Sequence, residues 1–160
     1  MKPCYCGSGK SFELCCERFL LNRDVVSGPR ELIQARYSAF CEKNLEYILL
    51  TSSIELKNEL SVKTLESWLT AVFFSGLEIL SVENDEFDNS HALVEFKAHF
   101  EVGDAPHVHY ETAHIIREKG RWVYDGMISM RERAEKGFKI SLDDPCLCGS
   151  GKIFRECCAK

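Results

Sequence analysis

The sequence predicts an α+β fold in which helices pack on a curved antiparallel sheet, with a small four-cysteine module at each terminus. Eight of the nine cysteines fall into two clusters at the ends of the 160-residue chain. Between the clusters, apolar residues recur first at helical spacing and then in strict alternation. We therefore expect three domains, over residues 1–22, 28–132 and 143–160.

The composition is that of an ordinary globular protein. Apolar residues make up 45% and charged residues 28% of the chain, and the net charge is −5. No run of Lys and Arg concentrates positive charge, so direct DNA binding is not expected. The apolar stretch over 70–80 is well short of the roughly 20 residues that a bilayer requires, and no apolar signal core follows Met1. We expect a cytoplasmic protein without membrane insertion, whose thiols stay reduced.

The middle domain is predicted to open with helices. Pro29 suits the first turn of a helix, and apolar residues then recur at helical spacing to about Glu42. Cys41, the ninth cysteine, falls on this apolar stripe, so we expect it in the core. Two shorter helices are expected over residues 45–50 and 62–69, with Asn44 and Ser61 as their N-caps.

Four strands are predicted after residue 70. The clearest covers 92–102, where apolar and polar residues alternate over eleven positions. The others are expected over residues 72–83, 107–118 and 121–128, the last two joined at Lys119-Gly120. An antiparallel meander of this kind needs a helix over its apolar face, and a concave sheet closed by a helix tends to enclose a pocket.

The two termini repeat one pattern, C-x-C-G-S-G-K-x-F-x-x-C-C. Ten of fourteen positions starting at Pro3 and Pro145 are identical, at a constant offset of 142. Four thiolates form the ligand set of a closed tetrahedral zinc site, and the glycines allow a sharp turn after the first sulfur pair. We predict two zinc ions per chain. The predicted ligands are Cys4, Cys6, Cys15 and Cys16 at one end and Cys146, Cys148, Cys157 and Cys158 at the other.

Other interpretations of the clusters remain open. The spacing does not distinguish zinc from iron. Internal disulfides or a redox pair are further alternatives, although redox motifs usually read C-x-x-C on a βαβ unit, which is not predicted here. The Gly-Ser-Gly-Lys segments resemble part of a phosphate-binding loop but lack its upstream glycine, because Cys4 and Cys146 occupy that place.

Both termini resemble the SEC-C motif, a zinc-binding module found at the tail of the bacterial preprotein translocase ATPase. The whole chain resembles the YchJ family, in which SEC-C modules surround a middle domain similar to the nuclear-transport-factor-two-like (NTF2-like) fold. The matching middle stretches are 36–40, 47–51 and 122–126. This resemblance implies a cystatin-like cone for the middle domain, and partners among export chaperones or ribosome-associated components.

Several polar residues could line a pocket in the middle domain. The candidates are Arg36, Tyr110, His114 and Asp125, with Glu111 as a further acid or base. Tyr110 and His114 share one strand face and are expected to point between sheet and helix, as a packed Tyr and a hydrogen-bonded His or as pocket residues. His107 and His109 share the other face, where a solvated role is favoured over metal binding.

Three functions are compatible with these features. The leading hypothesis is a non-enzymatic cytoplasmic adaptor whose zinc modules bind a protein partner. The alternative is a small-molecule-binding protein or enzyme that uses the pocket of the middle domain. A third is metal storage, which requires an accessible, weak site. The sequence specifies neither the partner nor the oligomeric state.

Overall fold

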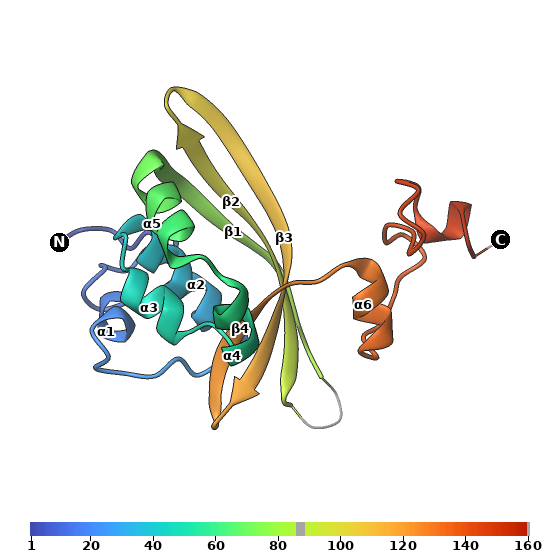
Figure 1. The fold of residues 1–160 in the computed structure, drawn as a ribbon, viewed down its shortest axis with the longest axis horizontal. Coiled ribbons are helices and arrows are strands. Elements are labelled where there is room, and N and C mark those ends of the chain that lie inside the picture. The colour runs from blue at the N-terminus through green and yellow to red at the C-terminus, as the bar shows by residue number, and fades with distance from the viewer. Residues whose placement is uncertain (86–88, 160) are drawn as a thin grey trace. The chain divides into compact units, whose positions relative to one another are not determined.

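The computed structural model describes residues 1–85 and 89–159 and confirms the α+β fold (Figure 1). Its strands form one antiparallel sheet in the order β1-β2-β3-β4. The strands are β1 (Val72–Asn84), β2 (His91–Val102), β3 (Ala105–Glu118) and β4 (Arg121–Met127). The helices are α1 (Glu17–Leu20), α2 (Pro29–Cys41), α3 (Leu45–Leu50), α4 (Ile54–Glu59), α5 (Val62–Ala71), α6 (Met130–Glu135) and the 3₁₀ helix η1 (Phe154–Glu156).

The chain divides into two compact units, Met1–Gly126 and Met127–Lys160. The first unit contains the N-terminal cysteines, helices α1 to α5 and the sheet, while the second contains α6 and the C-terminal cysteines. The predicted division into three domains stays a prediction. Within the described residues, no helix has the length and apolar character needed to cross a membrane.

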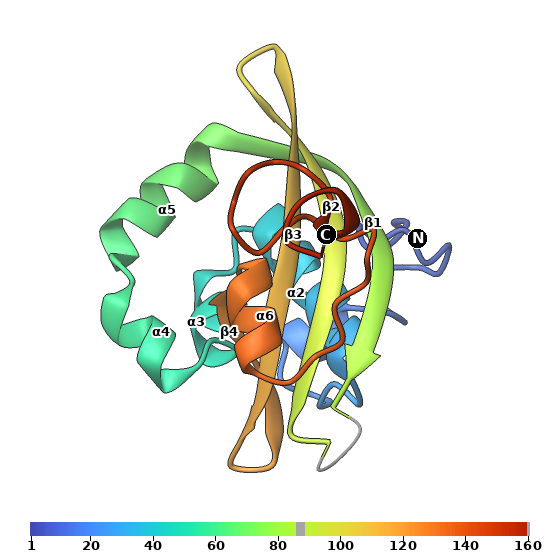
Figure 2. The same ribbon diagram turned by 90° about the vertical axis from the view of Figure 1, so that its right-hand side faces the viewer.

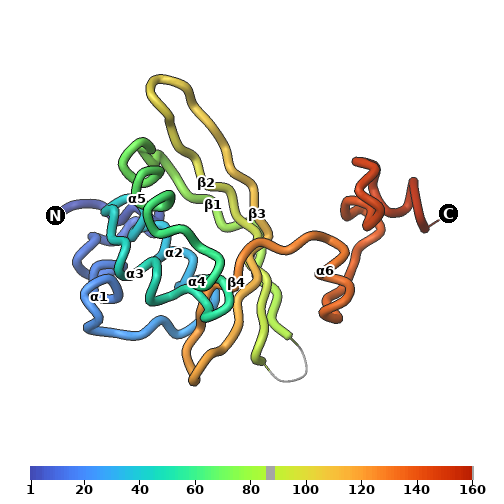
Figure 3. Tube along the Cα trace, in the orientation of Figure 1, coloured from blue at the N-terminus to red at the C-terminus, as the bar shows by residue number. Residues whose placement is uncertain are grey.

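Irregular pairing between β1 and β2 accounts for the curvature of the sheet. The register shifts between Phe74 and Gly76 and again between Ile79 and Ser81. Such bulges bend a strand and increase its twist. The trace in Figure 3 shows the long, bent hairpin of β2 and β3, and α2 lies behind these strands in Figure 2. The helices α1 to α5 lie on one side of the sheet in Figure 1.

Helix boundaries follow local side-chain caps. The side chains of Asn44 and Ser61 accept hydrogen bonds from backbone N–H groups in the first turns of α3 and α5, as predicted. Ser53 caps α4 in the same way, although the sequence pattern did not predict this helix. Helix α4 has no buried residue, so it carries no apolar periodicity to detect. The same holds for α6.

Helix α2 is the centre of the core. Eight of its thirteen residues are buried, among them the charged Arg36. Nη1 of Arg36 donates to the carbonyl oxygen of Ile48 at 2.9 Å and to the hydroxyl oxygens of Thr51 at 2.7 Å and Ser52 at 3.3 Å. These contacts attach the end of α3 to α2, and a buried guanidinium needs such acceptors because burial without them is costly.

Replacing Ile48 by Ala is expected to destabilise the first unit by about 2–5 kcal/mol, because Ile48 is fully buried and the substitution leaves a cavity. Leu50→Ala on the same helix is the matched control, since Leu50 is 45% exposed and should cost less than about 0.5 kcal/mol. Urea denaturation followed by circular dichroism measures both values. Equal losses would contradict the assignment of Ile48 to the core.

Candidate metal centres

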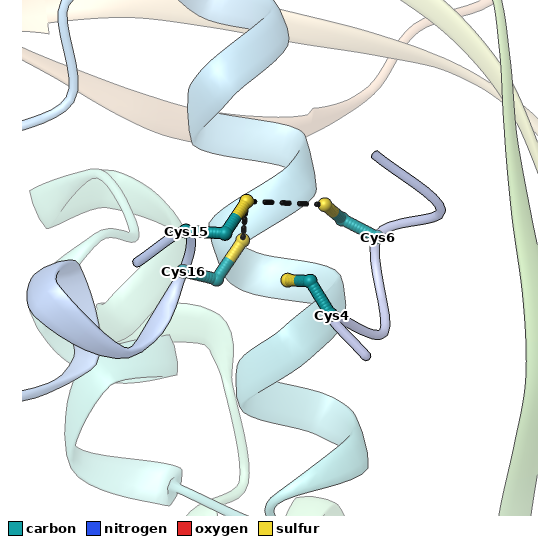
Figure 4. A group of neighbouring side chains, drawn as sticks. All are labelled: Cys4, Cys6, Cys15 and Cys16. Carbon is teal, nitrogen blue, oxygen red and sulfur yellow. Dashed lines mark hydrogen bonds between the residues drawn. The ribbon is translucent and has the colours of Figure 1, made fainter. Parts of the chain in front are cut away.

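Each terminal cluster brings four sulfur atoms together. Within each group of four cysteines, all sulfur atoms lie within 4.8 Å of one another. In the N-terminal cluster, the Sγ atoms of Cys6 and Cys15 are 3.7 Å apart and those of Cys15 and Cys16 are 3.9 Å apart (Figure 4). The figure shows the four sulfurs converging beside α2.

The C-terminal cluster has the same arrangement. Its Sγ–Sγ distances are 3.4 Å for Cys146 and Cys148, 3.4 Å for Cys148 and Cys157, and 3.9 Å for Cys157 and Cys158. All the cysteines are free thiols, and these distances far exceed the roughly 2.05 Å of a disulfide. A zinc–sulfur bond of about 2.3 Å in a tetrahedron places sulfurs about 3.8 Å apart, so both clusters fit a tetrahedral four-thiolate metal.

The two modules share their main backbone hydrogen bonds at matching positions. The N–H of Cys4 donates to the carbonyl of Lys10 at 2.9 Å, and that of Cys146 donates to Lys152 at 2.8 Å. Short antiparallel bridges pair Pro3 with Ser11 and Pro145 with Ile153. The 142-residue repeat in sequence is therefore a repeat in structure, and each module closes on its own four cysteines.

Glycines make the turn between the first and second sulfur pairs. Gly7 and Gly149 both have φ of 74°, and Gly9 and Gly151 have φ of 76° and 78°. These values lie in the left-handed region that residues with a Cβ rarely adopt. The turn also brings the serine between each glycine pair to the third cysteine. The Ser8 hydroxyl lies 3.3 Å from the sulfur of Cys15, and that of Ser150 lies 3.2 Å from the sulfur of Cys157.

Interactions within each cluster lower the pKa of the second cysteine and raise that of the last. The hydrogen bond from Cys16 lowers the pKa of Cys6, and the hydrogen bond from Ser150 lowers the pKa of Cys148 to about 6. The last cysteines shift the other way. The hydrogen bond to Cys6, together with burial, raises the pKa of Cys16, and the hydrogen bond to Cys146 raises the pKa of Cys158 to about 12. A metal that binds all four thiolates must therefore displace protons.

The N-terminal cluster is part of the core of the first unit. Cys4, Cys6 and Cys16 are buried, and the sulfur of Cys4 lies 3.9 Å from the Ser38 hydroxyl on α2. Phe12, which is also buried, packs edge-on against the Tyr5 ring. Burial of one such side chain contributes about 1.5–3 kcal/mol, so packing dominates this docking.

Polar contacts add less to the docking of the N-terminal cluster. Lys2 Nζ lies 2.7 Å from Glu42 Oε1 at the end of α2, and the Tyr5 hydroxyl donates to the same carboxylate. Both partners of the ion pair are more than a third exposed. Exposed pairs contribute about 0–1 kcal/mol, and these contacts mainly set the orientation of the module.

The C-terminal cluster is more open to solvent. Cys146 is buried, but Cys148 and Cys158 are exposed and Cys157 is half-buried. Phe154, the counterpart of the buried Phe12, is only half-buried. The module is held by its own contacts, including an ion pair between Arg155 and Asp143 and a hydrogen bond from the Phe154 N–H to the Asp144 carbonyl. The same ligand set therefore occupies two different environments.

The predicted pocket residues do not all lie together. Arg36 lines a cavity between α2 and the sheet, together with His109 and Glu111 of β3. Tyr110 is 54% exposed, and the cavity lining does not include it or His114. This is the opposite strand face from the one predicted. Residues 111–115 of β3 are all buried, so both faces of the strand are covered. Alternation of apolar and polar residues marks the buried face only where the other face is exposed, so it could not indicate which face of β3 meets the helices.

The remaining histidines and Asp125 have protein partners. His114 is buried, with its Nδ1 3.0 Å from Asp125 Oδ2 and its Nε2 3.0 Å from Nδ1 of His91. His107 stacks on the ring of Phe100. Sequence reasoning did not single out Tyr124, which joins Arg36 and Glu111 in the cavity wall. Tyr124 belongs to the stretch 122–126, but the sequence carries no sign that it meets α2.

Comparisons with known proteins agree with this architecture. The family described as YchJ, middle NTF2-like domain, matches residues 28–126, and the SEC-C motif matches residues 144–160. A UPF0225 protein of Haemophilus influenzae strain PittEE is 31% identical over 98% of this chain and 92% of its own length. A UPF0225 protein of Geobacter sulfurreducens is 29% identical over 97% of this chain and 96% of its own.

Two solved structures share the fold. A SEC-C motif-containing protein from Rhodopseudomonas palustris has a TM-score of 0.72 and 27% identity, and the match covers 81% of this chain and 99% of that one. One from Psychrobacter arcticus has a TM-score of 0.65 and 26% identity, covering 98% and 94%. From its NTF2-like middle domain, its SEC-C motif and relatives matched almost end to end, the chain belongs to the YchJ family of UPF0225 proteins.

Proposed function

We propose that this protein binds two structural zinc ions, one in each four-cysteine cluster, and that the metal-stabilised modules bind a protein partner. The spacing of the sulfurs carries the metal part of the proposal, because both clusters come close to the tetrahedral distance. Zinc is favoured over iron because a closed four-thiolate site without an open position is the usual structural zinc site. The residues present supply all four ligands in each module.

The two modules have different roles in this proposal. The N-terminal metal ties residues 1–16 to α2 and so belongs to the core. The C-terminal metal organises a short segment that has no buried helix of its own, since η1 contains no buried residue. Structural zinc supplies apparent binding free energies of about 10–16 kcal/mol, which is ample to order such a segment.

Exposed side chains between the ligands support the adaptor part of the proposal. Leu14, next to the ligand Cys15, is 73% exposed. Arg155 and Glu156 occupy matching positions between the C-terminal ligands and are also exposed. Because the metal holds the backbone, these side chains can vary without changing the site, and each module can present its own surface. By the family resemblance, the partner is an export chaperone or a ribosome-associated protein.

Purified protein is expected to contain two zinc ions per chain by inductively coupled plasma mass spectrometry. Cys16→Ser and Cys158→Ser occupy matching positions, and each should lower the content to about one. Cys41→Ser is the control and should keep two, because Cys41 lies outside both clusters. One metal per chain in the unmodified protein, or iron in place of zinc, would contradict the assignment.

The same variants should differ in stability. Cys16→Ser should lower the thermal midpoint of the whole first unit, since Cys16 is 1% exposed in its core. Cys158→Ser should leave that midpoint unchanged and increase proteolysis only after residue 142. Circular dichroism melts and mass spectrometry of tryptic fragments measure the two effects. Loss of the first-unit transition in Cys158→Ser would show that the units do not fold separately.

Zinc should leave the two sites at different rates. With excess chelator and a chromogenic zinc indicator, we expect one equivalent to be released quickly from the C-terminal site, where two ligands are exposed. The second equivalent should follow slowly from the buried N-terminal site. Cys158→Ser should remove only the fast phase and Cys16→Ser only the slow phase. A single phase for both equivalents would contradict the difference in burial.

The adaptor function is tested by exchanging exposed leucines. Leu14→Glu should abolish partner recovery in affinity purification from the native cells while both zinc ions stay bound. Leu50→Glu is the matched control, because Leu50 is 45% exposed but lies on α3, outside both modules. If Leu14→Glu and Arg155→Glu both leave the recovered proteins unchanged, the modules are not the partner surface.

A further inference from the structure

The concave side of the sheet contains an aromatic cavity that the proposed function of the zinc modules does not use. The cavity has a volume of about 210 Å³, and all its lining residues belong to the first unit. Helices α2 and α5 and strands β1 and β2 supply its aromatic wall, formed by Tyr37, Phe40, Trp68, Phe74, Phe96 and Phe100.

Five rings of this wall, all except that of Phe96, contact one another in a connected array. The ring centroids are 5.8 Å apart for Tyr37 and Phe74, 5.6 Å for Trp68 and Phe74, and 6.3 Å for Trp68 and Phe100. These pairs are edge-on, the arrangement that aromatic rings prefer. The wall therefore offers both ring faces and ring edges to an occupant, which suits a flat aromatic molecule.

Four other lining residues, Arg36, Tyr124, Glu111 and His109, form one contiguous polar region. The guanidinium of Arg36 lies over the ring of Tyr124, with its central carbon 4.4 Å from the ring centroid. The Tyr124 hydroxyl donates to Glu111 Oε1 at 2.6 Å, and Oε2 of Glu111 lies 2.8 Å from Nε2 of His109. Arg36 and Glu111 are both more than nine-tenths buried. A buried cation and a buried anion thus lie on either side of one tyrosine.

Arg36 retains donors that the protein does not use. Its Nη1 donates to the three acceptors of the α3 end, but Nη2 and Nε donate to no acceptor among the described residues. A guanidinium carries five N–H groups. Nε and Nη2 of Arg36 are not among the side-chain atoms buried without a partner, so they are accessible and can donate to an occupant of the cavity. Glu111 retains lone pairs on both carboxylate oxygens. The cavity therefore presents unused donors and unused acceptor capacity in the same region.

Charge and size restrict the occupant further. Arg36 and Glu111 cancel formally, so the polar region favours a neutral group over an anion or a cation. A cavity of 150 Å³ holds benzene, and typical pockets for drug-sized ligands begin near 300 Å³. The volume here lies between these values, so one or two fused rings fit.

We infer that this cavity binds a flat, uncharged aromatic molecule of one or two rings, whose polar edge accepts a hydrogen bond from Arg36 and donates one to Glu111. A cyclic amide in a fused heteroaromatic ring has this edge, because its carbonyl oxygen and N–H group are adjacent. The aromatic wall supplies apolar contact and the polar region supplies orientation. This inference is independent of the metal centres.

Three bicyclic probes of similar size separate the contributions. 2-Quinolinone carries the cyclic amide edge, naphthalene has no polar edge, and 2-naphthoate carries an anion. The indole N–H signal of Trp68 in a ¹⁵N spectrum reports binding, measured in a Trp122→Phe background that leaves one indole. Trp122 lies outside the cavity lining, so this background should bind as the unmodified protein does. We expect 2-quinolinone to bind about tenfold more tightly than either other probe.

Two pairs of comparisons test the residues. Glu111→Gln should weaken 2-quinolinone about tenfold and leave naphthalene unchanged, because only the amide edge uses the carboxylate. Ala98→Leu should abolish binding of every probe, because Ala98 lines the cavity and a larger side chain fills it. Lys97→Leu, the adjacent residue outside the lining, is its control and should bind normally. Circular dichroism confirms that each variant is folded.

Each contrary result overturns the inference. Equal affinity for naphthalene and 2-quinolinone would show that the polar region does not recognise the ligand. Tighter binding of 2-naphthoate would show that Arg36 selects an anion. Binding that survives Ala98→Leu would place the probe elsewhere, and no Trp68 shift with any probe at millimolar concentration would show that the cavity takes no aromatic ligand.

Discussion

The burial of helix α2 is the constraint on which the rest of the structure depends. The helix packs against the sheet, against α3 and against the N-terminal cysteine module, so few of its side chains reach solvent. Each polar group on it therefore needs a partner inside the protein. Arg36 finds acceptors at the end of α3, and Ser38 meets the sulfur of Cys4. Glu42, where the helix ends, receives Lys2 and Tyr5. One helix thus positions the sheet, α3 and the N-terminal cysteine module.

The two copies of the module have the same four-cysteine ligand set but differ in solvent exposure. The glycine turns and the main local hydrogen bonds are shared by both ends, because they depend on residues in or next to each repeat. Solvent exposure differs, because it depends on what packs around the repeat. At the N-terminus, Phe12 and Cys16 join the core around α2, whereas Phe154 and Cys158 at the C-terminus do not reach the same burial. Duplication therefore allows one copy to be part of the core while the other stays accessible to solvent.

The cavity follows from the curvature of the sheet. The bulges in β1 bend the sheet, and large rings on the curved strands line the space between the sheet and α2 without filling it. Buried charges in such a space are stable only when their hydrogen bonds are satisfied, and Tyr124 links the Arg36 and Glu111 ends of this arrangement. Arg36 therefore serves both the attachment of α3 and the chemistry of the cavity.

The sequence by itself determined the repeated modules, the order of the main helices and strands, and the caps at Asn44 and Ser61, because these depend on spacing and on contacts within a few residues. It did not reveal α4, since a helix without a buried face leaves no apolar periodicity. Only the tertiary structure decided that β3 turns His109 and Glu111, rather than Tyr110 and His114, toward the helices. It also decided that the N-terminal cysteines enter the core and that Tyr124 meets Arg36. These outcomes depend on packing between segments far apart in the chain, and a strand buried on both faces carries no local signal of its orientation.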